Sequence, residues 1–257
     1  MRVTVCELSN DEADFRTDWS KLIEYLDKNP ADLLLLPEMP FCEWIAYRSE
    51  TDESLKKYAV ARHEQFVGTF ESLNTARIVY SRPVLKNGLF HNTAYIWDRE
   101  NGERKIHTKQ YFPEEPHFYE ATWFDADDND FQLVEVGGVK IGVLLCTEMW
   151  FTEHARKYGT EGIDLLLCPR ATGKSSVDQW VRCGQTLAVI SGAYCLSANR
   201  CGKGKDGFQW GGASWIAQPG NGELLGVTSD RQPFVTIGID LQKARDAKIE
   251  YPLYVKA

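Results

Sequence analysis

The chain opens with a strand, a helix and a second strand in immediate succession, and this order strongly limits the fold. Residues 2–8 alternate as in a β-strand, and residues 11–27 carry apolar side chains at helical spacing. Residues 32–36 are an aspartate and four leucines, a run typical of a strand buried on both faces. Such a unit joins parallel strands through a crossover helix, so the sequence predicts an α/β fold.

Further strands and helices are predicted along the rest of the chain. We expect strands over residues 77–84, 91–97, 104–109, 131–136, 139–145, 163–168, 194–198, 213–217, 224–225 and 234–239, and helices over 55–73, 152–158, 177–190 and 241–247. No linker, repeat or low-complexity segment separates them, so we expect residues 1–257 to form a single domain. Residues 110–130 lack periodicity but are rich in aromatic side chains, which favours a functional loop over a disordered one.

Composition and charge exclude several classes of protein. Hydrophobic residues make up 43% of the 257 residues and charged residues 26%, as in an ordinary globular protein. The formal net charge of −8 argues against a nucleic-acid partner, because phosphate binding needs a basic face. We expect no membrane span, because no apolar run reaches 18 residues. The N-terminal residues lack the apolar core of a signal peptide and read directly as a strand.

The cysteines indicate a reducing compartment and no metal site. There are seven, at positions 6, 42, 146, 168, 183, 195 and 201. They form no CxxC pair, and none has a histidine at zinc-binding spacing. We therefore expect reduced thiols in a cytoplasmic protein without metal or cofactor.

Polar residues end several of the predicted buried strands. Glu38, Cys146 and Arg170 each follow such a strand, and Asn199 and Arg200 follow another. Because parallel strands bring their carboxyl ends to one edge of a sheet, we expect these side chains to converge there. Cys146 alone is more simply a core cysteine. The helix predicted after it would favour the thiolate, however, because the positive end of the helix dipole lies at its N-terminus.

Three more observations point to an activated thiol. Glu38 follows four leucines and a proline, so it must be paired or hydrogen-bonded, and burial would raise its pKa toward that of a general base. Lys109 opens the aromatic loop, where an ammonium would stabilise a thiolate or an oxyanion. Glu120 lies among aromatic residues, another setting for a perturbed carboxylate. Each has a structural explanation, but together they suggest a thiol that attacks an electrophilic carbon.

At this point the chain resembles the nitrilase, or carbon–nitrogen hydrolase, superfamily over nearly its whole length. The matching stretches are DLLLLPEMPF, TKQYFPEEPHFYEATWF, VKIGVLLCTEMWF, GIDLLLCPRAT, SANRCG and GGASWIAQPGNGELLG. The resemblance implies a four-layer α-β-β-α sandwich, paired as a homodimer or larger homo-oligomer, and no cofactor. It implies a catalytic triad of Glu38, Lys109 and Cys146, with Glu120 as a second glutamate. Lys105 is the alternative lysine, and Lys109 is preferred for its spacing to Glu120.

The resemblance also implies a mechanism and a class of substrate. Glu38 would take the proton of Cys146, and Lys109 with the backbone N–H of Thr147 would stabilise the oxyanion of an attacked amide. Nitrile-hydrolysing members usually have Trp-Glu after the cysteine, whereas this chain has Thr147 and Glu148, which favours an amide or N-carbamoyl substrate. The residues expected to line or adjust the substrate pocket are Tyr111, Phe112, Trp123, Thr147, Glu148, Trp150, Phe151, Arg170 and Arg200. The arginines are expected to hold a substrate carboxylate or to form structural ion pairs.

Four functions therefore remain open. The first is a thiol amidase acting on small linear amides, and the second is an N-carbamoyl amine or amino-acid hydrolase of the same fold. The third is a catalytically idle scaffold or binding subunit, against which the intact triad speaks. The fourth is a redox sensor that uses Cys195 and Cys201.

Overall fold

Two half-sheets share the first strand of the chain in the computed structural model, which describes residues 1–127, 131–204 and 206–255. Hydrogen bonds run through the order β5-β4-β3-β2-β1-β11-β10-β9-β8. The first half-sheet contains β1 (Arg2–Ser9), β2 (Leu33–Leu35), β3 (Arg77–Lys86), β4 (Leu89–Asp98), β5 (Gly102–Thr108) and β14 (Phe234–Gly238). The second contains β8 (Val134–Val136), β9 (Val139–Val143), β10 (Leu165–Arg170), β11 (Tyr194–Cys201), β12 (Trp215–Ala217) and β13 (Leu224–Val227).

Strand β1 changes partners along its length. Val3 and Val5 pair in parallel with Leu33 and Leu35 of β2, whereas Glu7 pairs with Asn199 of β11. Beyond this shared strand the half-sheets diverge and face each other, so the leucines and valines of β1, β2, β9, β10 and β11 form one core between them. The buried aliphatic runs that predicted parallel strands are explained by this core, because these strands are covered on both faces.

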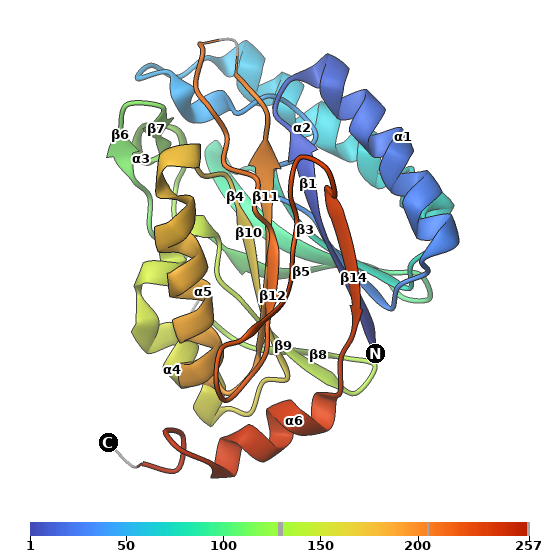
Figure 1. The fold of residues 1–257 in the computed structure, drawn as a ribbon. Coiled ribbons are helices and arrows are strands. Elements are labelled where there is room, and N and C mark those ends of the chain that lie inside the picture. Colours follow the sequence, from blue (N-terminus) through green and yellow to red (C-terminus); the bar gives the residue numbers. More distant parts are fainter. Residues whose placement is uncertain (128–130, 205, 256–257) are drawn as a thin grey trace.

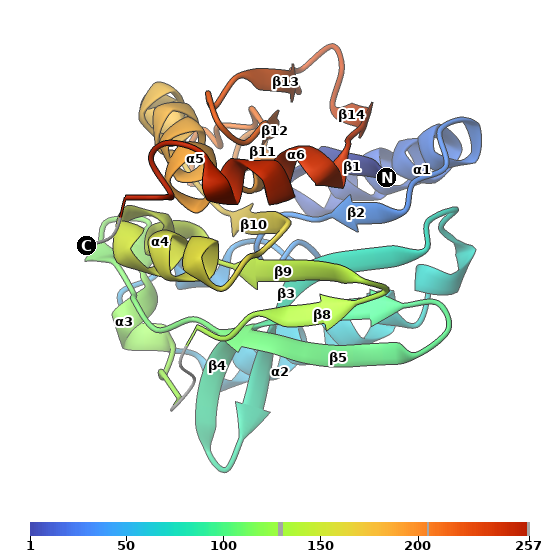
Figure 2. The same ribbon diagram turned by 90° about the horizontal axis from the view of Figure 1, so that it is seen from below.

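Helices cover the two outer faces, which completes the predicted four-layer α-β-β-α sandwich (Figure 1). Against the first half-sheet lie α1 (Glu12–Lys28) and α2 (Glu53–Val67), and against the second lie α4 (Thr152–Thr160) and α5 (Val177–Ser191). Seen from below, α6 (Leu241–Asp246) crosses one end of the sandwich (Figure 2). Asp11 begins α1 by accepting the N–H groups of Ala13 and Asp14, as its place before the apolar periodicity indicates.

The predicted elements are present, but two of them end earlier than expected for clear physical reasons. The helix predicted over 55–73 ends at Val67, where Gly68 follows, and the short helix η2 (Phe70–Ser72) is separate. The strand predicted to reach residue 145 ends at Val143, because the Leu145 N–H donates to the Glu148 carboxylate instead of to a neighbouring strand.

The aromatic loop predicted over 110–130 contains short ordered elements. They are β6 (Glu114–Glu115), β7 (Phe118–Tyr119) and the single-turn helix α3 (Glu120–Trp123). Positions 128–130 of this loop lie outside the described residues. None of the helices in the described chain combines the length and apolar character needed to cross a membrane.

Candidate active site

Strand ends from both half-sheets meet at one edge, as the parallel arrangement predicts. The N–H of Glu38, after β2, donates to the carbonyl of Arg170 at the end of β10 over 3.1 Å. The guanidinium of Arg200, in β11, donates to the carbonyls of Glu38, Met39 and Cys42. These bonds fix the backbone that carries Glu38 against the half-sheet that carries Cys146.

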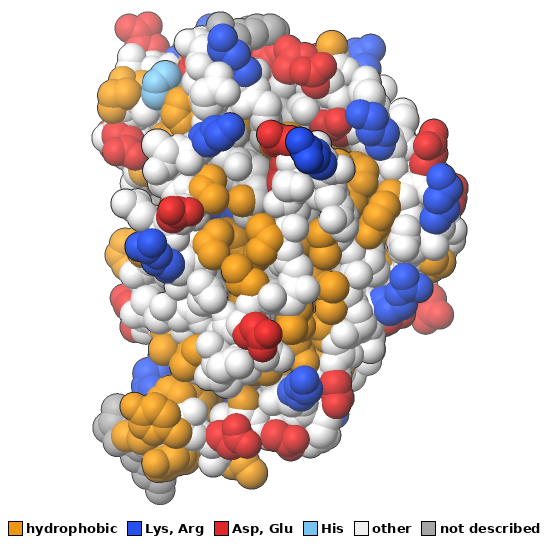
Figure 3. Space-filling model, in the orientation of Figure 1, with side chains coloured by type: hydrophobic (Ala, Val, Ile, Leu, Met, Phe, Trp, Pro, Cys, Tyr) orange, Lys and Arg blue, Asp and Glu red, His pale blue; other side chains and the backbone are white. Residues whose placement is uncertain are grey.

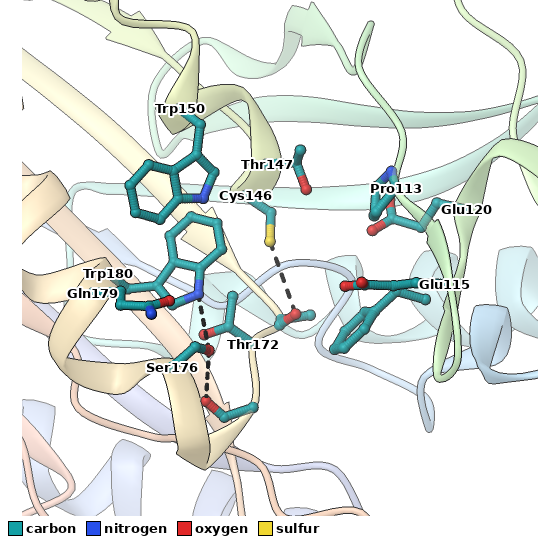
Figure 4. A pocket seen from close by; sticks show the side chains of 13 residues that line it. Pro113, Glu115, Glu120, Cys146, Thr147, Trp150, Thr172, Ser176, Gln179 and Trp180 are labelled. Atoms are coloured by element: carbon teal, nitrogen blue, oxygen red, sulfur yellow. Dashed lines mark hydrogen bonds between the residues drawn. The ribbon is translucent and has the colours of Figure 1, made fainter.

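Cys146 lies at a sharp turn between β9 and the short helix η3 (Cys146–Trp150). Its φ angle is +49°, in the left-handed region that side-chain-bearing residues seldom adopt. Such a conformation costs on the order of 1–3 kcal/mol and recurs at functional sites. The turn directs Sγ into a cavity, 3.8 Å from the carbonyl oxygen of Ala171 (Figure 4).

Beside Cys146, one buried ammonium lies between two buried carboxylates. Nζ of Lys109 is 2.8 Å from Oε1 of Glu38 and 2.5 Å from Oε2 of Glu120. Lys109 follows β5, and its backbone N–H is held by the carbonyl of Asn92. The Asn92 amide also donates to Oε1 of Glu38 over 2.7 Å. The remaining oxygens, Oε2 of Glu38 and Oε1 of Glu120, are buried without a partner among the described residues.

The buried charges determine which groups are ionised at rest. Burial raises the pKa of the Cys146 thiol, and Glu38 raises it further, while Lys109 opposes both. Burial alone would lower the pKa of Lys109, but Glu120 and Glu38 outweigh that effect and raise it, so the ammonium stays charged. Burial also raises the pKa of Glu120 to about 8, against the influence of Lys109. One cation does not neutralise two buried carboxylates, so the second one binds a proton readily.

The expectation that a helix N-terminus favours a resting thiolate at Cys146 is therefore wrong. The helix η3 separates Cys146 from α4, which begins only at Thr152, and the thiol is only 3% exposed. Loss of solvation then dominates the ionisation of the sulfur. The thiol is protonated at rest and needs a neighbouring base when it reacts.

The cavity into which Sγ points has a volume of about 260 Å³ (Figure 4). It is lined by Pro113, Glu115, Phe118, Glu120, Cys146, Thr147, Trp150, Ala171, Thr172, Gly173, Ser176, Gln179 and Trp180. Its walls come from the β6–β7 hairpin, the turn after β9, and the segment that joins β10 to α5. The size suits a small molecule of a few linked groups.

Of the nine residues expected to line or adjust the substrate pocket, Thr147 and Trp150 line this cavity, whereas Tyr111 and the other six do not. The Tyr111 hydroxyl is 2.8 Å from Nε2 of His154, and its ring stacks on Phe151 at a centroid distance of 4.0 Å. Tyr111 therefore packs against Phe151 and His154 and is not one of the residues that line the cavity.

Glu148 is a buried anchor and does not line the cavity. Its Oε2 accepts the Leu145 N–H at 2.7 Å and lies 2.8 Å from Nε2 of His107, and its Oε1 accepts the Gln110 N–H at 2.7 Å. These bonds join the turn before Cys146 to the segment just after Lys109. The carboxylate therefore fixes two parts of the site relative to each other, which differs from the expected substrate contact.

Arg170 also differs from expectation, because it points into the protein. Its guanidinium donates to Ser197 Oγ, Thr172 Oγ1 and the Ala213 carbonyl, and lies 4.0 Å from the centre of the Trp215 ring. The residue is fully buried and is not part of the cavity lining. Its role in this geometry is structural, as is that of Arg200.

Lys105 lies away from the cavity. Its ammonium pairs with Asp127 at 2.6 Å, and 46% of its side chain is exposed. Lys105 and Lys109 both belong to the end of the β5 segment, but only Lys109 points toward Glu38 and Glu120. The sequence spacing to Glu120 gave the same preference.

The sequence did not indicate Asn92, whose side chain donates a hydrogen bond to Glu38. It also did not indicate most of the residues that line the cavity, such as Glu115, Ser176 and Gln179. Asn92 lies inside an otherwise ordinary strand, and only its full burial marks it. Glu115 and Ser176 lie in short segments without a recognisable pattern, and Gln179 lies in the first turn of α5, where nothing local marks it as facing a cavity. The described residues contain no group of three or more His, Cys, Asp or Glu side chains arranged to hold a metal ion.

The seven cysteines are all free. Cys195 and Cys201 lie on one strand, six residues apart. At a rise of about 3.3 Å per residue they are separated by roughly 20 Å, far beyond the reach of a disulfide. Because both residues lie on the extended strand β11, they cannot form a disulfide with each other, and a redox switch that pairs them is excluded in this structure.

Residues 2–249 match the carbon–nitrogen hydrolase family, and the chain belongs to it. N-carbamoylputrescine amidase from Solanum tuberosum is 28% identical over 183 residues, which cover 65% of this chain and 61% of that protein. Among solved structures, a carbon–nitrogen hydrolase from Helicobacter pylori G27 superimposes with a TM-score of 0.86 at 20% identity, over 99% of this chain and 94% of the other. An amidase from Nesterenkonia sp. superimposes with a TM-score of 0.76 at 19% identity, over 96% and 92%.

Proposed function

We propose that this protein is a thiol-dependent hydrolase of small linear amides that acts through a thioester on Cys146. The observation that carries the proposal is the buried Glu38–Lys109–Glu120 network beside a thiol that faces a cavity. This network contains a base, a cation and a second carboxylate, the groups that acyl transfer through sulfur needs.

In the first half of the proposed reaction, the free Oε2 of Glu38 takes the thiol proton as Sγ attacks the carbonyl carbon. The C–S bond forms, and the carbonyl electron pair becomes an oxyanion stabilised by Lys109 and the Thr147 N–H. One such donor typically contributes about 3 kcal/mol. When the oxyanion collapses, the C–N bond breaks, Glu38 returns its proton to nitrogen, and ammonia or an amine leaves.

In the second half, water replaces the leaving group. Glu38 takes a proton from the water, whose oxygen attacks the thioester carbon, and the free Oε1 of Glu120 helps to orient it. The C–S bond then breaks, and the sulfur regains the proton. The balance is one amide and one water converted to one carboxylic acid and one ammonia or amine.

Chemistry at the cysteine of a structural relative supports this proposal. In a variant of the Nesterenkonia amidase, acrylamide is covalently added at the active-site cysteine. In the same variant, the acetamide moiety of fluoroacetamide is also found covalently added there. By analogy, Cys146 would accept electrophiles of amide size in its cavity.

The relationship to N-carbamoylputrescine amidase favours a second candidate, hydrolysis of an N-carbamoyl amine. The same groups would act, and the products would be an amine, ammonia and carbon dioxide. This candidate would be established over the first if a carbamoyl substrate released both carbon dioxide and ammonia while no amide in the panel released ammonia.

The test of the main proposal compares the wild type with Cys146→Ser over a panel of small amides. We expect ammonia release by the wild type only, and a mass increase on Cys146 equal to the acyl group in the quenched enzyme. An idle scaffold would release no ammonia, and iodoacetamide would label Cys146 no faster than the other cysteines. That result would overturn the proposal.

We further propose a cytoplasmic location and assembly into a homodimer or larger oligomer. Seven free cysteines support a reducing compartment. The C-terminal segment exposes Ile249, Tyr251 and Tyr254, apolar side chains that a second copy would cover. An apolar patch is visible at the lower left of Figure 3, the corner where this segment ends in Figure 1. Light scattering after size-exclusion chromatography measures the assembly.

A further inference from the structure

The cavity beside Cys146 has an unusual charge balance. Two carboxylic residues, Glu115 and Glu120, line it, and none of its described lining residues is lysine, arginine or histidine. The nearest buried cations are already occupied, since Lys109 lies between two carboxylates and Arg170 donates to Ser197, Thr172 and Ala213. A substrate that carries a carboxylate would therefore find no partner for its charge here.

Glu115 is the carboxylate of this cavity that the proposed chemistry does not use. It lies at the end of β6, where its backbone pairs with Phe118 of β7, and its exposed carboxylate has no hydrogen bond or ion pair with any described residue. Figure 4 shows its side chain extending from the hairpin into the cavity, with the carboxylate inward. An acceptor in this position is available to a ligand.

Its neighbour Glu114 provides a contrast. The Glu114 carboxylate accepts the backbone N–H of Thr122 at 3.0 Å and its hydroxyl at 2.6 Å. Glu114 thus holds the hairpin to α3 and does not line the cavity. Both adjacent glutamates are exposed, but only Glu115 lines the cavity.

The opposite wall is aromatic. The rings of Trp150 and Trp180 lie with their centroids 5.0 Å apart, and both line the cavity across from Glu115 (Figure 4). Indole faces favour methylene groups and cations over anions. The cavity therefore presents an apolar surface on one side and a free negative charge on the other.

We propose that the substrate is a small linear amide or urea whose far end carries an ammonium group, and that Glu115 binds this group. The proposal rests on the hydrolase function above and specifies its substrate class. The reacting carbonyl lies at Cys146, the methylene chain lies along Trp150 and Trp180, and the cation pairs with the Glu115 carboxylate. The ion pair is charge-assisted and lies at the mouth of the cavity, so it acts mainly on substrate binding.

The test uses three substrates of matched length: 5-aminopentanamide, hexanamide and the monoamide of glutaric acid. They differ at the far end, which is cationic, neutral or anionic. We expect the wild type to have the highest kcat/KM for the cationic amide, by about tenfold over hexanamide, which is near the lower end of what a hydrogen bond to a charged group contributes. The anionic amide should be the poorest of the three.

Glu115→Gln should reduce the cation-to-neutral ratio about tenfold, chiefly through KM, and Glu115→Lys should shift preference toward the anion. Glu114→Gln is the matched control and should leave the ratio unchanged. The pair 4-aminobutylurea and pentylurea repeats the comparison for carbamoyl substrates. If the wild type hydrolyses hexanamide as well as 5-aminopentanamide, or if Glu115→Gln keeps the ratio, the substrate proposal fails while the hydrolase function stands.

Absence of turnover with every compound would count against the hydrolase function instead. Calorimetric binding to Cys146→Ser then tests the cavity on its own. Tighter binding of 5-aminopentanamide than of hexanamide, lost in Cys146→Ser/Glu115→Gln, supports the ammonium site. Equal binding of the two compounds overturns it.

Discussion

Replacing Lys109 with methionine should impair both catalysis and stability, for reasons that the structure separates. The ammonium is fully buried between Glu38 and Glu120, so its removal leaves both buried carboxyl groups without their cationic partner. Breaking a buried ion pair in this way typically costs about 3–5 kcal/mol of unfolding free energy. Loss of one donor to the oxyanion typically lowers kcat by about 10²- to 10³-fold.

Lys105→Met is the matched control, four residues away on the same segment. Lys105 is nearly half exposed and forms a surface ion pair, a type of contact that contributes about 0–1 kcal/mol. We therefore expect a small change in stability and nearly unchanged turnover. The measurements are unfolding in urea, for stability, and ammonia release from a cleaved amide, under conditions in which circular dichroism shows each variant folded.

The double variant Lys109→Met/Glu120→Gln distinguishes the two effects. Replacing one of the two acidic groups should restore part of the lost stability, because only one buried carboxyl group then lacks a cationic partner. It should not restore turnover, because the ammonium is still absent. If Lys105→Met loses turnover as severely as Lys109→Met, or if Lys109→Met is fully active, the reasoning from the buried network is refuted.

Two other predictions concern the scaffold. Burial lowers the pKa of His63 from 6.5 to about 3, so its folded-state pKa lies below the unfolded value. The contribution of neutral His63 to the free energy of unfolding should be fully present above pH 6.5. It should be lost as pH falls toward 3, by up to about 5 kcal/mol. His63→Gln should reduce that slope in pH-dependent urea titrations, and an unchanged slope would exclude His63 as its origin. A Cβ on Gly184 would lie 2.4 Å from the Trp215 indole, so Gly184→Ala should lose about 1–3 kcal/mol despite alanine's helix preference, whereas Gly238→Ala, with open space around it, should not.

The sequence predicted the fold well because its strands are unusually apolar. Four leucines before Pro37 allow few arrangements other than a strand covered on both faces, and the second half-sheet covers one face while α1 and α2 cover the other. The family resemblance added the four-layer arrangement, which the structure confirms. Strand ends were less predictable, since Leu145 leaves the ladder for a side chain three residues away.

Positions in the candidate site could be predicted where residues follow strands. They could not be predicted where contacts between residues distant in sequence determine the direction of a side chain. Glu38 and Lys109 come directly after strands, so topology alone brings them together. Arg170 also follows a strand, but its side chain turns inward to Ser197, a contact that no local pattern reveals. The ionisation state of Cys146 depends on burial, so the expected resting thiolate was wrong.

Strand β1 has a consequence for how the site responds to changes far from it. The carboxylate and ammonium belong to segments of one half-sheet and the sulfur to the other, and β1 is the strand in which the two are continuous. The spacing between base and nucleophile is thus governed by the thickness of the aliphatic layer sandwiched between the sheets. Adding a methylene to that layer, or removing one, would change the distance between Glu38 and Cys146 and so slow proton transfer between them, although the protein would still fold. The packing of the hydrophobic core thus affects the rate of the reaction at the edge of the sheets.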